Sequence, residues 1–249
     1  MKDFLKISYK FLKKKIEKIL DRRNAKKRIK FKKNCQSFNT IKIDTTGYTS
    51  PLCILGEKYG TDKSIYNKKT KHQHSYTAVY NILFNHLKNK TINIAEIGIA
   101  HSSSLQMFRD YFKHSNIYAF DHDKTVIEQS KKLNINNVNY FQLDVKDRIE
   151  IQKLFKKNNI FYDIIIDDSS HLFDHQINII LETKNFLKEN GILVIEDIYL
   201  KEKKYSEELY YTNLNYLKKE FSDIFFCTCE HEYNYSGFWN NCKLLVLIK

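Results

Sequence analysis

From about residue 90 to the C-terminus, short apolar segments alternate with amphipathic ones, and this alternation constrains the fold more than any other feature. Five segments have the composition of strands: 92–98 (INIAEIG), 116–121 (NIYAFD), 138–144 (VNYFQLD), 162–168 (YDIIIDD) and 191–197 (GILVIED). Segments with helical spacing of apolar residues lie between them, and the longest of these predicted helices is 172–188 (LFDHQINIILETKNFLK). Short strands that alternate with helices are typical of a parallel sheet covered by helices on both faces. The pattern therefore predicts a doubly wound α/β fold.

The end of the chain departs from this alternation. A long helix is expected near 203–222, and the two apolar segments 223–231 (DIFFCTCEH) and 242–249 (CKLLVLIK) follow with only a loop between them. Two strands without an intervening helix form a hairpin, which places one strand antiparallel to its neighbours. We predict a Rossmann-like, mostly parallel sheet of seven strands with one antiparallel strand near the C-terminus.

The chain divides into three parts by composition. Residues 1–40 are a basic, amphipathic, helical extension, and residues 91–249 are the α/β core. Between them, residues 41–90 are rich in polar side chains and end in an amphipathic helix, SYTAVYNILFNHLK. We expect this middle part to be a cap or lid over the top of the sheet.

The positive charge of the chain is concentrated in its first part. The chain has 42 Lys and Arg and 29 Asp and Glu, of which 15 and 3 lie in residues 1–33, so that the rest holds 27 basic and 26 acidic residues. A nucleic-acid-binding domain usually carries its basic residues along a groove or face of the folded body. The balanced body therefore argues against nucleic acid as a partner of the core.

Residues 1–33 also carry an apolar stripe on a predicted helix, formed by Leu5, Tyr9, Leu12, Ile16 and Ile19. Three interpretations stay open for this segment: contact with an anionic membrane surface, docking to a partner, and packing on its own domain or on a second subunit in a homo-oligomer. The chain has no apolar run long enough to span a membrane and no secretory signal, so we expect a cytoplasmic protein, with peripheral attachment to the inner membrane face left open.

The five cysteines, an odd number, lack CxxC or zinc-like spacing. We expect free thiols in a reducing compartment, with Cys227 and Cys229 on one face of a strand.

Acidic residues stand at or near the ends of all five core strands. They are Glu96, Asp121, Asp144, Asp167 with Asp168, and Glu196 with Asp197. Any single one suits a helix N-cap, where a carboxylate accepts backbone N–H groups. In a doubly wound sheet, however, ligands bind beyond the carboxyl ends of the strands, and all of these residues lie at that edge. Together they indicate a binding site.

The first strand-end loop, EIGIAHSSSLQMF, lacks the G-x-G-x-x-G pattern that brings a dinucleotide close to a helix N-terminus. It resembles the first motif of class I S-adenosylmethionine-dependent methyltransferases, with Gly98 at the close approach and Ser102 where a second glycine is usual. Asp121, which ends the second strand, fits the carboxylate that binds two ribose hydroxyls in related folds. Asp144, at the end of the third strand, resembles the residue that holds the adenine amine in such methyltransferases. These residues predict an adenosine site.

Asp168, Glu196 and Asp197 follow two adjacent strands and are expected to converge. Grouped carboxylates repel one another unless a cation joins them, and hard oxygen ligands suit Mg²⁺, Mn²⁺ or Ca²⁺. His171, three residues after Asp168, is expected to face the same point as a general base. A capping or surface role is the alternative for His171.

These motifs resemble the macrocin-type, metal-dependent sugar O-methyltransferases, a branch of the class I methyltransferases, over residues 54–248. The resemblance rests on LGEKYGTDKS (55–64), HSY (74–76), EIGIAHSSSLQMFRDYF (96–112), IIDDSSH (165–171), GILVIEDIY (191–199) and CKLLVLIK (242–249). Ser169 and Ser102 replace glycines that are commoner in that group.

The resemblance implies a divalent metal, Mg or Mn, held by Asp168, Glu196 and Asp197, with His171 and Asp168 as catalytic residues. It implies S-adenosyl-L-methionine as cofactor, and we assign to its site Thr61, Lys63, Glu96, Gly98, Ser102, Ser104, Asp121, Asp144 and Asp167. Asp62 and Tyr76 belong to the segment that is expected to fold over the cofactor or substrate.

The expected reaction is methylation of a sugar hydroxyl, on a nucleotide-activated hexose or heptose or on a surface glycan such as a capsular polysaccharide. Two alternatives remain open. One is a nicotinamide-dependent sugar oxidoreductase on a similar sheet, which the missing G-x-G-x-x-G disfavours. The other is an RNA methyltransferase that uses the basic N-terminal segment, which the balanced charge of the body disfavours.

Overall fold

The computed structural model describes residues 36–200, 205–236 and 241–249. The chain divides into two compact units, Met1–Ser37 and Phe38–Lys249, and all the described helices and strands belong to the second. The predicted N-terminal helix, its apolar stripe and Cys35 lie outside the described residues. Phe38–Lys249 form a single compact unit, so the boundary between a cap at 41–90 and a core at 91–249 stays a prediction.

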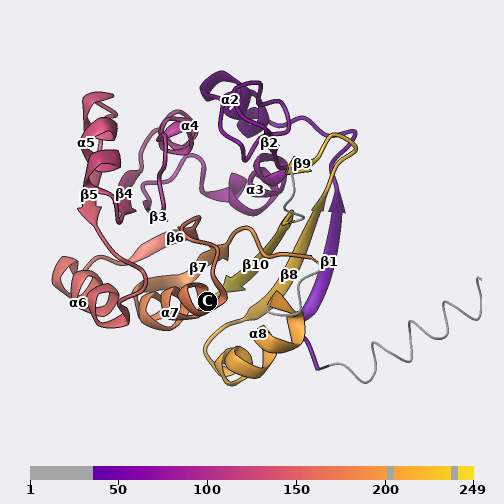
Figure 1. Cartoon of the computed structure of the whole chain (residues 1–249), viewed down its shortest axis with the longest axis vertical. Helices are drawn as coiled ribbons and strands as arrows, with labels where there is room; N and C mark the ends of the chain where they lie inside the picture. The colour runs from indigo at the N-terminus through magenta and orange to yellow at the C-terminus, as the bar shows by residue number, and fades with distance from the viewer. Residues whose placement is uncertain (1–35, 201–204, 237–240) are drawn as a thin grey trace, which may run out of the picture. The chain divides into compact units, whose positions relative to one another are not determined.

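An eight-stranded sheet organises this unit (Figure 1). Its strands are β1 (Asn39–Asp44), β3 (Asn93–Ile97), β4 (Asn116–Asp121), β5 (Val138–Gln142), β6 (Tyr162–Asp167), β7 (Leu187–Ile195), β8 (Asp223–Glu230) and β10 (Lys243–Ile248). They lie in the order β1-β8-β10-β7-β6-β3-β4-β5. The strands β7, β6, β3, β4 and β5 are mutually parallel, whereas β10 is antiparallel to both β7 and β8. The predicted doubly wound sheet with an antiparallel C-terminal strand is confirmed.

The predicted number of strands, seven, is wrong, because β1 adds an eighth parallel to β8. Strand β1, with the sequence NTIKID, lies at the edge of the sheet and four of its six residues are exposed. It spans the predicted boundary between the N-terminal extension (1–40) and the polar cap (41–90). A short edge strand needs little apolar surface of its own, since its backbone is paired on one side only. Its pattern is therefore too weak to detect without its partner.

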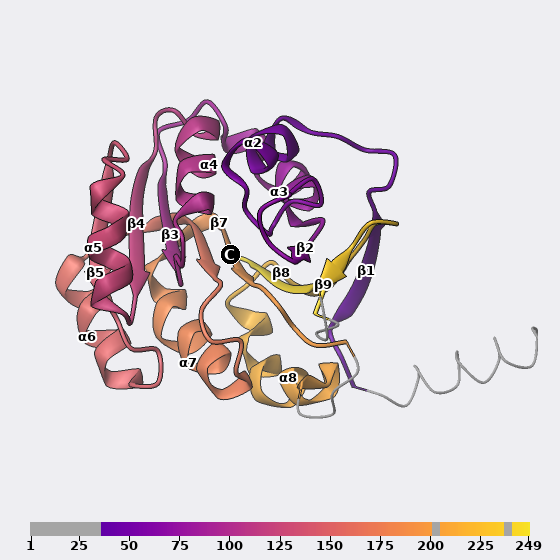
Figure 2. The same ribbon diagram turned by 45° about the horizontal axis from the view of Figure 1, so that its top comes forward.

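Helices cover both faces of the sheet (Figures 1 and 2). They are α2 (Pro51–Tyr59), α3 (Tyr76–Phe84), α4 (Ser103–Tyr111), α5 (Lys124–Lys132), α6 (Arg148–Asn158), α7 (Phe173–Thr183) and α8 (Glu207–Leu214). Short 3₁₀ turns follow three of them, η1 (Asn85–Leu87), η2 (Lys184–Phe186) and η4 (Asn215–Lys219). A two-stranded sheet of β2 (His72–Gln73) and β9 (Tyr235–Ser236) completes the described elements.

Two hydrophobic cores result, one on each face of the sheet. Ile165 of β6 packs with α6, α7 and α8, while its neighbours Ile164 and Ile166 pack with α2, α3 and α4. Successive residues of a strand point to opposite faces, so a strand between two helical layers is apolar throughout. The apolar run that precedes Asp167 is thereby explained.

Two predicted helices are shorter than expected. The helix near 203–222 is α8 followed by η4, where the chain tightens at Asn215, whose side-chain amide donates to the Tyr211 and Thr212 carbonyls. The helix at 172–188 ends at Thr183, and β7 begins at Leu187. Helix ends without glycine or proline leave little trace in the sequence.

Four cysteines are described, and all four are free and buried. Cys227 and Cys229 lie on one face of β8 with their sulfur atoms 3.9 Å apart, as predicted. Within the described part of the chain, no helix has both the length and the hydropathy that a membrane crossing requires.

Candidate active site

The acidic residues predicted at the strand ends gather at one edge of the sheet. Asp167 is the last residue of β6, and Asp121 is the last of β4. Glu196 and Asp197 directly follow β7, and Asp144 follows β5 by two residues. Because these strands are parallel, all five carboxylates lie at the same side.

A cavity of about 410 Å³ opens between the loops that follow β3, β4, β5 and β6. Four of its lining residues were predicted, namely Gly98, Asp121, Asp144 and Asp168. Sequence reasoning missed several other polar lining residues, which are His122, Asp123, Lys146, Ser170 and His175. The first three lie within two residues of a predicted acid, so proximity to a strand end was the signal that could have found them.

Gly98 is required at this edge for two reasons. Its φ of +88° is in the left-handed region, which residues with a side chain adopt at a cost. A Cβ atom here would also lie 2.1 Å from the carbonyl oxygen of Asp168, inside any van der Waals contact. Gly98 thus brings the loops after β3 and β6 together beneath the cavity.

Asp121 shapes the loop as well as the cavity. Its Oδ2 accepts the Ile99 N–H at 3.1 Å, and its Oδ1 accepts the Asp123 N–H at 2.9 Å. Each carboxylate oxygen has two lone pairs, so Oδ2 keeps a further acceptor site, while His122 Nδ1 lies 3.4 Å from Oδ1. Asp144 is arranged similarly, with Oδ1 accepting the Lys146 N–H at 3.0 Å.

Six of the nine residues assigned to the cofactor site are not among the residues that line the cavity. Ser102 is buried and its hydroxyl donates to Ser130 Oγ of α5 at 2.7 Å. Thr61 and Ser104 are buried. Asp167 accepts the Ser169 N–H and hydroxyl on Oδ1, while its Oδ2 has no hydrogen-bond partner among the described residues. The remaining two, Lys63 and Glu96, belong to a cluster of charged side chains.

Lys63 forms the centre of a buried charge cluster. Its side chain is 2% exposed, and its Nζ donates to Glu196 Oε2 at 2.7 Å and to Asp168 Oδ2. Glu96 Oε1 lies 3.9 Å away from the same nitrogen. The three carboxylates come from the ends of β3, β6 and β7, so one ammonium from the 60–75 segment joins three strands. Sequence reasoning assigned Lys63 to the cofactor and did not foresee this position.

Burial controls the protonation of this cluster. Burial raises the pKa of Glu96 to about 7, although the charge of Lys63 opposes the shift. Burial likewise raises the pKa of Asp167 and of Asp168 to about 6. Burial and the nearby charges of Asp168 and Asp197 hold the pKa of Glu196 well above its usual range, against the effect of Lys63. A cation is therefore needed to keep these groups ionised together.

For Lys63 itself, burial acts to lower the pKa, but the charges of Asp168, Glu196 and Glu96 outweigh it and raise the pKa well above the usual value. The ammonium form is thus secure. An ammonium with such partners is a stable element of the cluster, because separating it would leave buried anions unpaired.

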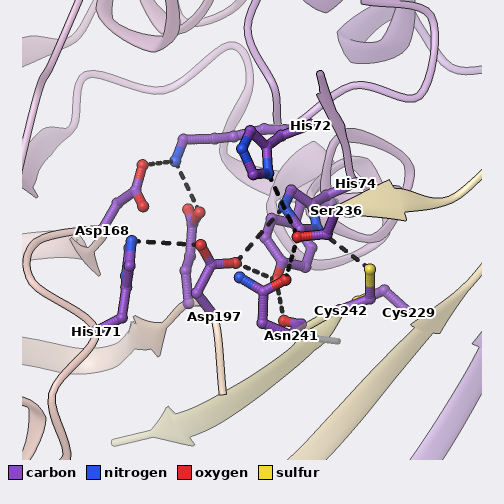
Figure 3. Close-up of polar contacts among 12 residues, drawn as sticks. His72, His74, Asp168, His171, Asp197, Cys229, Ser236, Asn241 and Cys242 are labelled. Carbon is purple, nitrogen blue, oxygen red and sulfur yellow. Dashed lines mark hydrogen bonds and ion pairs between the residues drawn. The ribbon is translucent and has the colours of Figure 1, made fainter. Parts of the chain in front are cut away.

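Asp197 is set apart from this ion pair. Its Oδ1 accepts the Tyr76 hydroxyl at 2.7 Å, and its Oδ2 lies 3.5 Å from His171 Nε2 (Figure 3). Burial would raise the pKa of Asp197, but His74, His171 and the Tyr76 hydrogen bond lower it below its usual value. Asp197 therefore remains a carboxylate.

Asp168, His171 and Asp197 have ligand atoms that all lie within 4.8 Å of one another, a spacing compatible with one metal ion. Glu196, the third predicted ligand, uses Oε2 for Lys63 and Oε1 for the Tyr80 hydroxyl. The structure thus brings together Asp168 and Asp197 of the predicted ligands, with the predicted base beside them, and holds Glu196 against Lys63.

The backbone at this site is unusual. His171 and Asp197 have φ values of 57° and 58°, and Ala100 and Ser102 in the loop after β3 have 37° and 60°. Such conformations cost on the order of 1–3 kcal/mol each for residues with a side chain and occur preferentially at functional sites. Their concentration at one edge supports the assignment of this edge as the active site.

The chain is similar in sequence to enzymes that methylate sugars. It is 26% identical over 132 residues to 8-demethyl-8-alpha-L-rhamnosyl tetracenomycin-C 2'-O-methyltransferase of Streptomyces olivaceus, covering 50% of this chain and 33% of the relative. It is 25% identical over 134 residues to mycinamicin VI 2''-O-methyltransferase of Micromonospora griseorubida, covering 51% and 32%. The chain thus spans about a third of the length of these relatives. No family model matches the chain.

The fold is that of a solved methyltransferase. The structure of MycE methyltransferase in complex with Mg, SAH and mycinamycin VI superposes with a TM-score of 0.57 at 20% identity, over 80% of this chain and 54% of MycE. A second MycE structure, with Mg and SAH, gives a TM-score of 0.59. The predicted resemblance to sugar O-methyltransferases and to the class I methyltransferase fold is confirmed.

Proposed function

We propose that this chain is an S-adenosylmethionine-dependent and divalent-metal-dependent O-methyltransferase that acts on a sugar hydroxyl. One observation carries the proposal. The cavity lined by Gly98, Asp121 and Asp144 adjoins the cluster of Asp168, His171 and Asp197, and Asp168 belongs to both. A methyl donor and an acceptor activated by a metal must meet at such a junction.

The cavity fits the adenosine part of the cofactor. Asp121 lines the cavity and its Oδ2 keeps an acceptor site for a ribose hydroxyl, and Asp144 lies one loop further for the adenine amine. Val126 and Leu143 add apolar surface for the base. Five other residues assigned to the cofactor do not line the cavity and would instead shape the loops around the cofactor. They are Thr61, Ser102, Ser104, Glu96 and Asp167.

The proposed ligands of Mg²⁺ or Mn²⁺ are Asp168, Glu196 and Asp197, whose carboxylate oxygens suit such an ion. Asp168 and Asp197 lie together, whereas Glu196 would have to exchange a contact with Lys63 or Tyr80 for the ion. A divalent ion bound there supplies Lewis-acid chemistry that makes a sugar hydroxyl more acidic. Lys63 neutralises part of the cluster and keeps Asp168 close to Glu196. This holds the carboxylates in place before any ligand arrives.

His171 is the proposed general base. Its ring is partly exposed, with Nε2 held 3.5 Å from Asp197 Oδ2. Nε2 would accept the proton of the sugar hydroxyl as the oxygen attacks the sulfonium methyl in line, a transfer that depends mainly on positioning. Asp168 assists by fixing the acceptor side of the cavity.

A small-molecule sugar is the proposed acceptor, because the relatives are named for methylation of sugars on antibiotics and one MycE structure contains mycinamycin VI. A nucleotide-activated hexose or heptose, or a sugar of a surface glycan such as a capsular polysaccharide, is the finer form of the proposal. A cytoplasmic location, with residues 1–33 at the inner membrane face, belongs to the same finer form.

The test is incubation with labelled S-adenosylmethionine, Mg²⁺ and a panel of nucleotide sugars and antibiotic glycosides, followed by mass spectrometry. The expected product gains one CH₂ group on the sugar, and EDTA should abolish turnover while leaving cofactor binding intact. Thermal shifts should appear with S-adenosylmethionine and not with NAD. Full activity after chelation would remove the metal from the mechanism, and a shift with NAD alone would favour the oxidoreductase.

A further inference from the structure

The carboxylate of Asp197 is divided between two environments. Oδ2 faces His171, at the side where Asp168 also presents its carboxylate. Oδ1 faces the opposite way, into the buried layer formed by α3 and the small β2–β9 sheet (Figure 3). The orientation of Asp197 Oδ2 therefore depends on the groups that hold Oδ1.

Tyr76, the first residue of α3, holds that second oxygen. Its side chain is completely buried, and its hydroxyl lies 2.7 Å from Asp197 Oδ1 and 2.8 Å from the carbonyl oxygen of Asn241. A phenol has one hydrogen to donate, and a carboxylate is a stronger acceptor than a carbonyl. The hydrogen bond to Asp197 is thus the dominant one.

His74 supports the phenol from behind. Its ring stacks on the Tyr76 ring with centroids 4.8 Å apart and planes 8° from parallel, and its Nε2 lies 3.9 Å from Asp197 Oδ1. Its Nδ1 contacts Cys242 Sγ at 3.2 Å. Asn241, whose carbonyl faces Tyr76, accepts the Ser236 hydroxyl, and Ser236 contacts His72. Both ends of the stack are thus fixed by residues of the β2–β9 region.

One turn later on α3, Tyr80 makes the corresponding contact with Glu196. Residues four apart on a helix share a face, so α3 presents one phenol to each of two consecutive carboxylates. The difference between them is that Glu196 is also paired with Lys63, whereas Asp197 faces the open side of the site.

We propose that Tyr76 is a positioning residue for the carboxylate of Asp197. Its hydroxyl donates to Oδ1 and thereby orients Oδ2 toward the point between Asp168 and His171. This orientation sets the affinity of that point for a divalent cation. The inference rests on the proposed function. Removing a residue that hydrogen-bonds to a metal ligand, without contacting the metal itself, typically lowers metal affinity about 10–100-fold.

The experiment is titration of the full chain with Mn²⁺ alone, followed by electron paramagnetic resonance of the free ion. Tyr76→Phe should weaken Mn²⁺ binding about 10–100-fold, because Asp197 is then free to rotate. The dissociation constant for S-adenosylmethionine should stay unchanged, since Tyr76 does not line the cavity. A merely structural role would not separate these two constants.

Tyr111→Phe is the matched control. Tyr111 is 1% exposed and its hydroxyl donates to Asn81 Oδ1 at 2.8 Å, away from the cluster. This variant should bind Mn²⁺ within about twofold of the unchanged chain. Equal losses in the two variants would overturn the proposal, because they would reflect a general loss of packing.

A second variant covers the case in which Tyr76→Phe does not fold. His74→Phe keeps an aromatic ring against Tyr76 and removes the nitrogen that faces Asp197, so it should weaken Mn²⁺ binding severalfold. Normal Mn²⁺ binding by folded variants overturns the role of Tyr76. Absence of Mn²⁺ binding by the unchanged chain overturns the metal in the proposed function instead, so the two failures are distinguishable.

Discussion

The cavity and the charge cluster lie at the same edge of the sheet but are built in different ways. Every lining residue of the cavity lies between Ile97 and His175, within four successive strand–loop–helix units. The cluster needs Lys63, Tyr76 and Tyr80, which come from a segment that precedes the first core strand and crosses over the carboxyl ends of β3, β6 and β7. A binding cavity can thus arise from local loops, whereas the cluster depends on long-range closure.

If the cluster carries the chemistry and the cavity carries cofactor binding, removal of the proposed base should cause the largest loss of turnover. His171→Ala should lower turnover about 10²–10⁴-fold, the usual contribution of a positioned general base, with little change in cofactor affinity. Steady-state kinetics and calorimetric titration with S-adenosylmethionine measure the two effects. His86→Ala, at an exposed position of η1, is the control. A turnover near that of the control would assign the proton to another group.

Next in size is the effect of removing the cation that joins the strands. Lys63→Met should destabilise the fold by about 3–5 kcal/mol, because the buried carboxylate of Glu196 loses its cation and keeps only the Tyr80 hydroxyl, while the partly exposed Asp168 loses the same ammonium. Urea unfolding measures this loss, and Mn²⁺ should restore part of it by occupying the same carboxylates. Lys68→Met removes an exposed pair with Glu57 and should have almost no effect. Equal stability of the two variants would mean that the cluster does not depend on closure.

On the cavity side, a smaller and more local effect is expected. Asp121→Asn should weaken S-adenosylmethionine binding by about 1.5–3 kcal/mol, the usual contribution of hydrogen bonds to a charged group. Asp147→Asn is the matched control, since Asp147 also accepts two backbone N–H groups but lies outside the cavity. Unchanged cofactor affinity in Asp121→Asn would separate Asp121 from the ribose.

The smallest effect is expected at Ser102. Ser102→Gly removes the hydrogen bond to Ser130 but relieves a left-handed φ of 60° that glycine adopts freely. The two changes oppose each other, so stability and cofactor affinity should both stay within about 1 kcal/mol of their original values. Thermal unfolding and calorimetry check this. A large loss of affinity would show that the serine hydroxyl serves the cofactor directly.

Much of the architecture was predictable because it is encoded locally. The alternation of strands and helices depends on the periodicity of neighbouring side chains, and the acids at strand ends follow from which edge of a parallel sheet they occupy. Gly98, Asp121 and Asp144 could be assigned to the cofactor cavity on this basis, and Asp168, which also lines it, was assigned to the metal. The eighth strand, β1, could not, because its place beside β8 depends on a pairing between residues almost 190 positions apart.

The sequence by itself therefore determined the parallel sheet, its antiparallel C-terminal strand and the gathering of carboxylates at one edge. Only the tertiary structure decided which carboxylates face one another and what neutralises them: Lys63 between Asp168 and Glu196, and Tyr76 behind Asp197. The physical reason is that periodicity fixes the face and the edge of each side chain, whereas pairing of buried charges depends on how a distant segment closes over them.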